Sequence, residues 1–388
     1  MPKSSPNDKA LQTTSSANVP TLQRAKSLVK LANSILGGDR SPTVHKAWLE
    51  ELIAWADENA ISEDVLPRDA DKIYDLKELV LLFKRLKYLP NSIGNLTGLE
   101  KLFLDLNNFS ILPDSIGNLI NLRELTLSLN KQLSGLPNSI GNMSNLERLD
   151  LGSTNLSGLP NTIRNLTNLK FLNWGGNEHA MLPDFIWGLT NLEMLGLGSN
   201  GLSKFPESIG NLNKLTALGL SYNNLSALPD SIKDLAKLKE LYLTENHFEN
   251  LPDPIVDLTN LRKLHLGWNN MSALPATIEN LINLKELFLR GNNLSMLPDS
   301  IGNLTNLEEL HLGDNGLQNL PESIGKLTKL KVLGLGSNRF SRLPDFLGNM
   351  VNLQKLCLSR DQSIPPNLSH LESIIEWPDP EDEWRIPI

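Results

Sequence analysis

Apolar and polar positions follow one order repeatedly along most of this chain. A unit of 23 residues, well preserved in LKELFLRGNNLSMLPDSIGNLTN from Leu284, recurs from about residue 76 to the C-terminal region. Two leucines alternate with outward positions in each unit, as Leu310 and Leu312 do, which predicts a short strand with these two side chains inward. The second half, L-P-x-S-I-G-N-L, carries a proline near its start and is too short for a long helix, so one or two helical turns are expected.

The units start at leucines that lie 23 residues apart, except that the step from Leu122 to Leu146 has one extra residue. The starting leucines are Leu76, Leu99, Leu122, Leu146, Leu169, Leu192, Leu215, Leu238, Leu261, Leu284, Leu307, Leu330 and, for an incomplete unit, Leu353. One unit cannot bury its apolar residues alone, whereas thirteen stacked units share a continuous core. Because stacked strands lie about 4.8 Å apart, the sheet should run for roughly 60 Å.

An asparagine recurs where each predicted strand ends. Its column contains Asn107, Asn130, Asn177, Asn200, Asn223, Asn246, Asn269, Asn292, Asn315 and Asn338. We predict that these amides are buried and bond backbone groups of their own and the neighbouring coil. Thr154 replaces the asparagine in one unit, and Trp174 replaces an inward leucine. We interpret Trp174 as a core residue, with a ligand-stacking role as the alternative.

The unit L-x-x-L-x-L-x-x-N-x-L-x-x-L-P-x-S-I-G-N-L-T-N resembles the leucine-rich repeat, in the 23-residue form found in intracellular Ras-group scaffolds and many bacterial repeat proteins. The resemblance covers about three quarters of the chain. It implies an α/β fold, a right-handed solenoid with a curved parallel sheet on the concave face and short helical turns on the convex face. It also implies a protein as the ligand.

The rest of the chain divides around this array. Residues 1–20 are rich in Ser, Thr, Asn and Pro, which predicts a disordered tail, with an export leader as the alternative. Residues 21–75 have apolar residues at helical spacing, with Ser41 and Pro42 at the start of a second helix. We interpret them as a helical N-terminal cap, although a basic first helix could also lie on a membrane surface. Residues 76–352 form twelve repeats, and 353–388 form a partial repeat with a C-terminal cap or tail.

Composition narrows the classes of partner and compartment. The formal net charge of −8 argues against nucleic-acid binding, and Cys357 has no second cysteine to pair with. We find no apolar run of signal-peptide or membrane-span length, so no stable membrane insertion is expected. We therefore predict a monomer that is cytoplasmic or is exported into a host cell by a dedicated secretion system.

Catalytic and cofactor motifs are missing from the sequence. It has no G-x-x-x-x-G-K-S/T loop, no H-E-x-x-H and no C-x-x-C, so no cofactor, metal or catalytic residue is predicted. His265 and His311 lie two repeats apart, too far to share a metal, and we interpret them as surface polar residues. Cys357 lies in the last partial repeat, and too little chain follows it for a catalytic domain, so we predict that the protein is not an enzyme.

The outward strand positions supply the candidate binding surface. Its predicted partner-binding residues lie on adjacent units: Tyr222, Tyr242, His265, Trp268, Phe288, Arg290 and His311. Tyr, Trp and Arg dominate interface energetics, whereas single exposed aromatic residues are ordinary. Other outward positions are glycines, which reflect either repeat drift or a face left bare for a partner's backbone. A second apolar group near the N-terminal end is interpreted as the seat of the helical cap rather than a second partner site: Leu82, Phe83, Phe103, Leu106 and Leu129.

These observations favour a non-catalytic protein-protein interaction module that binds a protein partner on the concave face. Our preferred setting is a bacterial effector acting in host cells. The alternative is a cell-surface adhesin or receptor that recognises a host glycoprotein or glycan.

Overall fold

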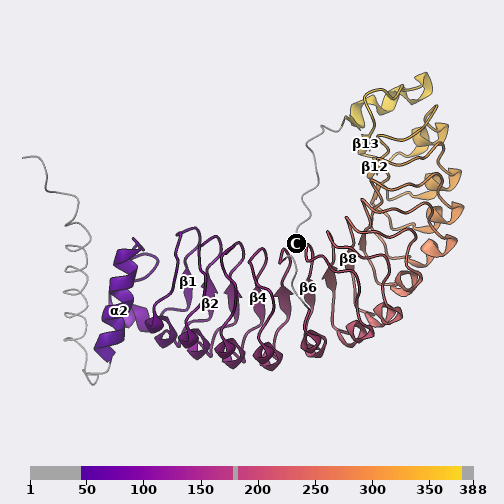
Figure 1. Ribbon diagram of the computed structural model, residues 1–388. Helices are drawn as coiled ribbons and strands as arrows, with labels where there is room; N and C mark the ends of the chain where they lie inside the picture. Colours follow the sequence, from indigo (N-terminus) through magenta and orange to yellow (C-terminus); the bar gives the residue numbers. More distant parts are fainter. Residues whose placement is uncertain (1–44, 178–181, 378–388) are drawn as a thin grey trace, which may run out of the picture.

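Residues 45–177 and 182–377 are described by the computed structural model. Within them, fourteen short parallel strands pair edge to edge in sequence order and form one open sheet. A short 3₁₀ helix follows each of the first thirteen strands, and the coils stack into a curved solenoid (Figure 1). The structure does not describe the predicted tail at 1–20, the predicted first helix of the 21–75 cap, the predicted start of its second helix at Ser41 and Pro42, or residues 378–388.

The strands have three residues each, apart from the last, which has two. They are β1 (Glu78–Val80), β2 (Lys101–Phe103), β3 (Glu124–Thr126), β4 (Arg148–Asp150), β5 (Phe171–Asn173), β6 (Met194–Gly196), β7 (Ala217–Gly219), β8 (Glu240–Tyr242), β9 (Lys263–His265), β10 (Glu286–Phe288), β11 (Glu309–His311), β12 (Val332–Gly334), β13 (Lys355–Cys357) and β14 (Ile375–Glu376). The last strand extends the sheet beyond the thirteen units counted in the sequence.

The 3₁₀ helices occupy the convex side, and a proline precedes each of them at the N-cap, as Pro298 does with φ −72° and ψ 148°. They are η1 (Asn91–Asn95), η2 (Asp114–Asn118), η3 (Asn138–Asn142), η4 (Asn161–Asn165), η5 (Asp184–Gly188), η6 (Glu207–Asn211), η7 (Asp230–Asp234), η8 (Asp253–Asp257), η9 (Ala276–Asn280), η10 (Asp299–Asn303), η11 (Glu322–Lys326), η12 (Asp345–Asn349) and η13 (Pro366–Ile374). The prediction of short helical turns opposite the strands is confirmed.

Register between coils follows the repeat, so each inward leucine lies beside its equivalents. Leu287 pairs with Leu264 on one side and Leu310 on the other. Leu310 and Leu312 are fully buried, as the alternation of the sequence predicts, and Trp174 is also fully buried in the core. The apolar residues of all coils form one continuous cluster that the N-terminal helices join.

The asparagine column joins one coil to the next through its amide groups. Asn292 Nδ2 donates to the carbonyl oxygens of Leu266 (3.0 Å) and Leu289 (2.9 Å), and its Oδ1 accepts a hydrogen bond from Met271 N (3.1 Å). Where the column changes to Thr154, the hydroxyl lies 3.1 Å from the carbonyl oxygen of Leu151 in its own coil and 2.6 Å from Asn177 Oδ1 in the next coil. Each asparagine therefore binds backbone groups of both coils that it joins.

Two helices, α2 (His45–Glu58) and α3 (Ala70–Tyr74), close the N-terminal end of the core. Leu52 and Ile53 of α2 are fully buried, as is Leu79 of β1. The loop between the helices is held by Arg68, whose Nε and Nη2 lie 2.9 Å and 2.7 Å from Asp57 Oδ1, with both side chains almost wholly buried. A helix-and-loop cap thus shields the first coil, as terminal repeats require.

This cap does not cover the apolar rim predicted as its seat. Phe83 is 71% exposed, and Leu82, Leu106 and Leu129 are exposed as well. Helix α2 packs beside η1, on the convex side, and Trp55 Nε1 donates to the carbonyl oxygen of Tyr88 (3.2 Å). The interpretation of the rim as a seat is therefore wrong for cap residues 45–75.

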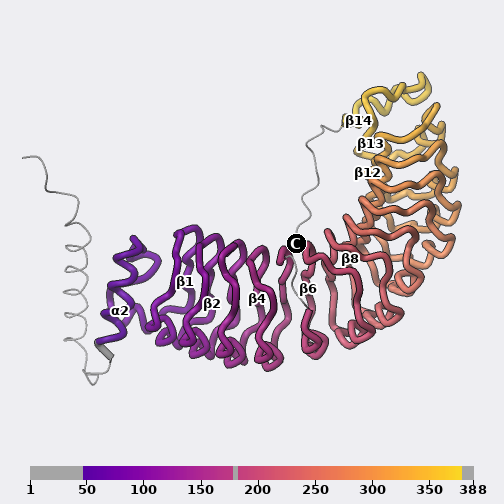
Figure 2. Tube along the Cα trace, viewed as in Figure 1, coloured from indigo at the N-terminus to yellow at the C-terminus, as the bar shows by residue number. Residues whose placement is uncertain are grey.

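The solenoid is nearly straight from β1 to β6 and bends strongly from β7 to β13 (Figures 1 and 2). In the straight part, glycines let neighbouring 3₁₀ helices touch: a Cβ on Gly94 or Gly117 would lie 2.2 Å or 2.3 Å from a carbonyl oxygen of the next coil. Larger residues replace this glycine in both the straight and the bent part: Arg164, Trp187, Lys233, Val256 and Glu279. Gly302, in the bent part, makes the same close approach, with a Cβ 2.3 Å from a carbonyl oxygen of the next coil, so this position alone does not explain the bend.

Candidate functional site

The concave face is built from the first and third residues of each strand, because the middle residue points into the core. In β8, Leu241 is buried while Glu240 and Tyr242 flank it on the outer surface. We call the first residues of the strands the leading column and the third residues the central column. Since the strands pair in register, each column is continuous across the sheet.

Four rings of the central column stack across β8 to β11. The ring centroids of Tyr242 and His265 lie 4.8 Å apart, those of His265 and Phe288 4.0 Å, and those of Phe288 and His311 4.0 Å. The last pair is nearly parallel, at 15°. We call Tyr242, His265, Phe288 and His311 the ring stack. It gives this face a rigid, largely apolar ridge.

Stacking buries the two histidines. His265 is 8% exposed and His311 4% exposed, so the interpretation of both as surface polar residues is wrong. Burial, with a smaller effect of Lys263, lowers the pKa of His265 to about 4, and no group within the described residues bonds its Nε2. At neutral pH the His265 ring is therefore uncharged and packs like an aromatic residue.

Carboxylates of the leading column contact both ends of the stack. The Tyr242 hydroxyl donates to Glu240 Oε2 (2.8 Å), and burial together with this carboxylate raises the pKa of the phenol above its usual range. At the other end, His311 Nε2 lies 3.2 Å from Glu309 Oε2, and this hydrogen bond lowers the pKa of Glu309. The polar tips of the stack thus point to acidic groups rather than to the core.

Exposed aromatic side chains lie beside the stack, where the chain leaves the strands. Tyr222 is 50% exposed and Trp268 42% exposed, and both have positive φ values, 58° and 53°. Arg290 lies 5.6 Å from the centroid of the Trp268 ring and is 2.6 Å from Asp314 Oδ2. Trp268 packs over Gly291, where a Cβ would lie 2.4 Å from its ring. The seven predicted binding residues therefore occupy one region, with Tyr222 and Trp268 as its exposed aromatic members.

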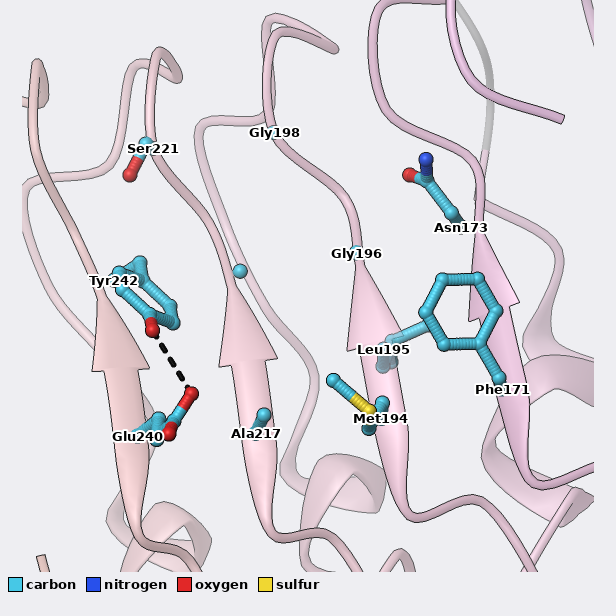
Figure 3. A pocket seen from close by; sticks show the side chains of 11 residues that line it. Phe171, Asn173, Met194, Leu195, Gly196, Gly198, Ala217, Ser221, Glu240 and Tyr242 are labelled. Carbon is cyan, nitrogen blue, oxygen red and sulfur yellow. Dashed lines mark hydrogen bonds between the residues drawn. The ribbon is translucent and has the colours of Figure 1, made fainter. Parts of the chain in front are cut away.

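A hollow of about 70 Å³ opens in the concave face between β5 and β8 (Figure 3). Three of its lining residues are glycines, which contribute no side chain to fill it: Gly196 and Gly219 of the central column, and Gly198, two residues after Gly196. Phe171 and Met194 border it on one side, and Glu240 and Tyr242 on the other (Figure 3). The glycines were visible in the sequence, but their position beside the ring stack became clear only from the fold.

A chain of polar side chains, which sequence reasoning did not identify, covers the straight part of the concave face. Asp105 accepts hydrogen bonds from Thr126 Oγ1 and Ser128 N, and Asp150 accepts from Ser128 Oγ and Asn173 Nδ2. Burial raises the pKa of Asp105 despite these bonds. Because these groups bind one another, much of the hydrogen-bonding capacity of this stretch is already used within the chain.

Other chemistry finds little support in the geometry. No group of His, Cys, Asp and Glu side chains in residues 45–177 and 182–377 could hold a metal ion. Burial raises the pKa of the Cys357 thiol, which disfavours the thiolate needed by a nucleophile. None of the described helices has the length and apolar character needed to cross a bilayer.

Known proteins with this repeat match most of the chain. The profile of a leucine-rich repeat region matches residues 104–215, 204–290 and 276–376. A leucine-rich repeat protein of Leptospira interrogans is 32% identical, with a TM-score of 0.60, over 79% of this chain and 97% of that chain. No protein with a curated description matches the chain.

Two further structures extend the comparison. An internalin of Listeria monocytogenes shares the fold at 24% identity and a TM-score of 0.68, over 80% of this chain and 89% of that chain. The plant peptide hormone receptor RGFR1, solved in complex with RGF2, is 32% identical over 73% of this chain, with a TM-score of 0.54. This chain corresponds to 52% of the receptor chain.

Proposed function

The chain belongs to the leucine-rich repeat family, and from this premise we propose that it is a non-catalytic module that binds a protein partner on its concave face. The fold is that of a protein-interaction scaffold. The observation that supports the proposal is the ring stack, a continuous aromatic ridge on the concave face, together with the exposed rings of Tyr222 and Trp268 on coils of the same region.

Rigidity makes this surface suitable for binding. The stacked rings are held at 4.0 Å to 4.8 Å by strands of the same sheet, so few side-chain rotamers are lost when a partner binds. Interface energy concentrates in Trp, Tyr and Arg side chains that a partner can surround and desolvate. Trp268 and Arg290 supply two of these types beside each other, and Tyr222 supplies the third on a coil two repeats away.

Exposed aromatic residues provide the sharpest test. Tyr242 and Phe288 support the buried histidines, so replacing them would disturb folding as well as binding. Tyr222→Asn with Trp268→Asn removes only exposed rings, and asparagine tolerates the positive φ at both positions. We expect an unchanged unfolding midpoint and a loss of about 2 kcal/mol or more in partner binding.

The partner would first be captured on the full-length chain from host and bacterial lysates and identified by mass spectrometry. Its affinity for each variant would then be measured by calorimetry. The matched control is Lys233→Ala with Lys326→Ala, two exposed convex-side residues of η7 and η11. Normal binding by the Tyr222 and Trp268 variant together with loss of binding by the convex variant would refute the concave-face proposal.

For the biological setting, we propose a monomeric bacterial effector that acts inside host cells. Similarity to a repeat protein of Leptospira interrogans supports a bacterial origin. A fusion to a calmodulin-dependent adenylate cyclase, expressed in the bacterium that carries the gene, should raise cyclic AMP in infected cells. No rise in cyclic AMP, with the chain accessible to protease on intact bacteria, would favour the adhesin or receptor alternative.

A further inference from the structure

The ring stack has an open end at the hollow. In the central column, Tyr242 pairs in register with Gly219, which pairs in register with Gly196. Each strand step is about 4.8 Å, so two consecutive positions of the stack, close to 10 Å in all, carry no side chain. The side of the Tyr242 ring away from His265 therefore borders open space rather than another ring.

At the same place, one carboxylate of the leading column has no ion pair. Three other carboxylates of the column form ion pairs: Glu78 lies 3.7 Å from Lys101, Glu124 3.2 Å from Arg148, and Glu286 3.1 Å from Lys263. Glu240 has no ion pair with any described residue, because its neighbour on β7 is Ala217 and its neighbour on β9, Lys263, pairs with Glu286. A carboxylate at the edge of an apolar hollow thus has a hydrogen bond from Tyr242 and the nearby charge of Lys263, but no ion pair of its own.

Elsewhere on the same sheet, an arginine both stacks on a ring and pairs with a carboxylate. Arg148 lies 3.5 Å from the centroid of the Phe171 ring, and its Nε lies 3.2 Å from Glu124. One guanidinium therefore stacks on the ring of the next strand while it pairs with a carboxylate of the preceding strand. On β7, Gly219 supplies no group that could stack on the Tyr242 ring, and Ala217 supplies no charge that could pair with Glu240.

Resting on the concave-face binding proposed above, we propose that the hollow receives an arginine side chain of the protein partner. Its guanidinium packs against the Tyr242 ring beside Gly219 and pairs with Glu240, while its aliphatic stem contacts Met194 and Ala217. Arginine fits better than lysine because its planar head stacks on rings and binds a carboxylate with two hydrogen bonds. A neutral aromatic side chain would desolvate Glu240 without pairing with it, which is costly.

Small probes test this chemistry on the full-length chain without the partner. Met194 lines the hollow, so its ¹³C-methyl resonance, identified among the seven methionines with Met194→Leu, reports occupancy. We expect Nα-acetyl-argininamide to shift this resonance with an affinity about tenfold higher than the neutral isostere Nα-acetyl-citrullinamide, since a charged hydrogen bond is roughly twice as strong as a neutral one. Equal affinities, or no shift with either probe, would overturn the proposal.

Filling the open position should block the probe. A Cβ on Gly219 would lie 3.7 Å from Gly196 Cα, an ordinary contact, so Gly219→Phe can add a fifth ring without displacing backbone. Gly334→Phe is the matched control at the other end of the stack, where a Cβ would lie 3.4 Å from His311 Nδ1. We expect Gly219→Phe to abolish the Met194 shift and Gly334→Phe to preserve it; the opposite pattern would contradict the assignment.

Charge is tested separately with Glu240→Gln, which keeps an acceptor for the Tyr242 hydroxyl. The arginine probe should then bind about as weakly as the citrulline probe, a loss of about tenfold, or ~1.4 kcal/mol. Unchanged affinity of the arginine probe for Glu240→Gln would show that the carboxylate does not bind the guanidinium.

The isolated partner distinguishes this inference from the proposed function. Loss of partner binding by Gly219→Phe, with Gly334→Phe normal, supports the arginine site. If the partner binds Gly219→Phe normally but fails to bind the Tyr222 and Trp268 variant, concave-face binding stands and the arginine site is overturned. Normal binding by both variants would overturn both.

Discussion

Replacement of Asn292 by alanine should reveal how much one amide contributes to the stacking of coils. The side chain is 6% exposed and takes part in three hydrogen bonds, of 2.9 Å, 3.0 Å and 3.1 Å, with backbone groups of two coils. A hydrogen bond contributes about 0.5–1.5 kcal/mol net, so three contribute roughly 1.5–4.5 kcal/mol. We expect Asn292→Ala to lower the free energy of unfolding by about 3 kcal/mol, because the backbone groups left behind are shielded from water.

Urea unfolding followed by far-UV circular dichroism measures this loss as a shift of the midpoint. The exposed neighbour Asn293 supplies the control, and Asn293→Ala should change stability by less than about 0.5 kcal/mol. Asn292→Thr should fall between the two, because a threonine hydroxyl can still donate one hydrogen bond at this position, as Thr154 does. A midpoint for Asn292→Ala equal to that of Asn293→Ala would refute the assignment of the asparagine column as the link between coils.

Three further predictions concern the cap, the convex side and the ring stack. Arg68→Met should destabilise the protein in urea by about 3–5 kcal/mol by leaving the Asp57 carboxylate buried without its partner, and adding Asp57→Leu should restore much of this loss. Gly117→Ala should lower the melting temperature, since its Cβ would lie 2.3 Å from a carbonyl oxygen of the next coil, whereas Gly188→Ala, with no atom within 4 Å, should not. The pKa of His265 is about 4 in the folded chain and about 6.5 in the unfolded chain, so between these pH values the unfolded chain binds the extra proton. The free energy of unfolding should therefore fall as the pH drops from 6.5 to 4, by at most about 3 kcal/mol. Urea titrations at each pH should show that His265→Phe removes this dependence.

The fold could be predicted because its determinants repeat locally. Alternating leucines define each strand, the proline defines the start of each convex turn, and the constant period places equivalent residues side by side. The inward positions of Leu310 and Leu312 followed from this alternation alone. Trp174 could be assigned to the core for the same reason, since its position in the unit is inward.

Burial on the concave face could not be read from position within one unit. An outward side chain is exposed or buried according to its neighbours 23 residues away on either side. His265 is buried because Tyr242 and Phe288 are both rings, while Glu240 has no ion pair because Ala217 lies on one side of it and Lys263, on the other side, pairs with Glu286. Both features depend on which residues stand next to each other on neighbouring strands. The residue types of the outward positions therefore indicated the region of the candidate site, but not which of its side chains are exposed.

The curvature of the solenoid affects how side chains meet on the concave face. Neighbouring strands are about 4.8 Å apart, yet the centroids of His265 and Phe288 are only 4.0 Å apart. Side chains on the inner side of a bent stack lean together, so the bend beyond β6 brings rings into contact that a straight sheet would hold further apart (Figure 2). The same bend turns the hollow and the exposed Trp268 towards a common centre, which favours a partner that enters the curve over one that lies flat on the straight end.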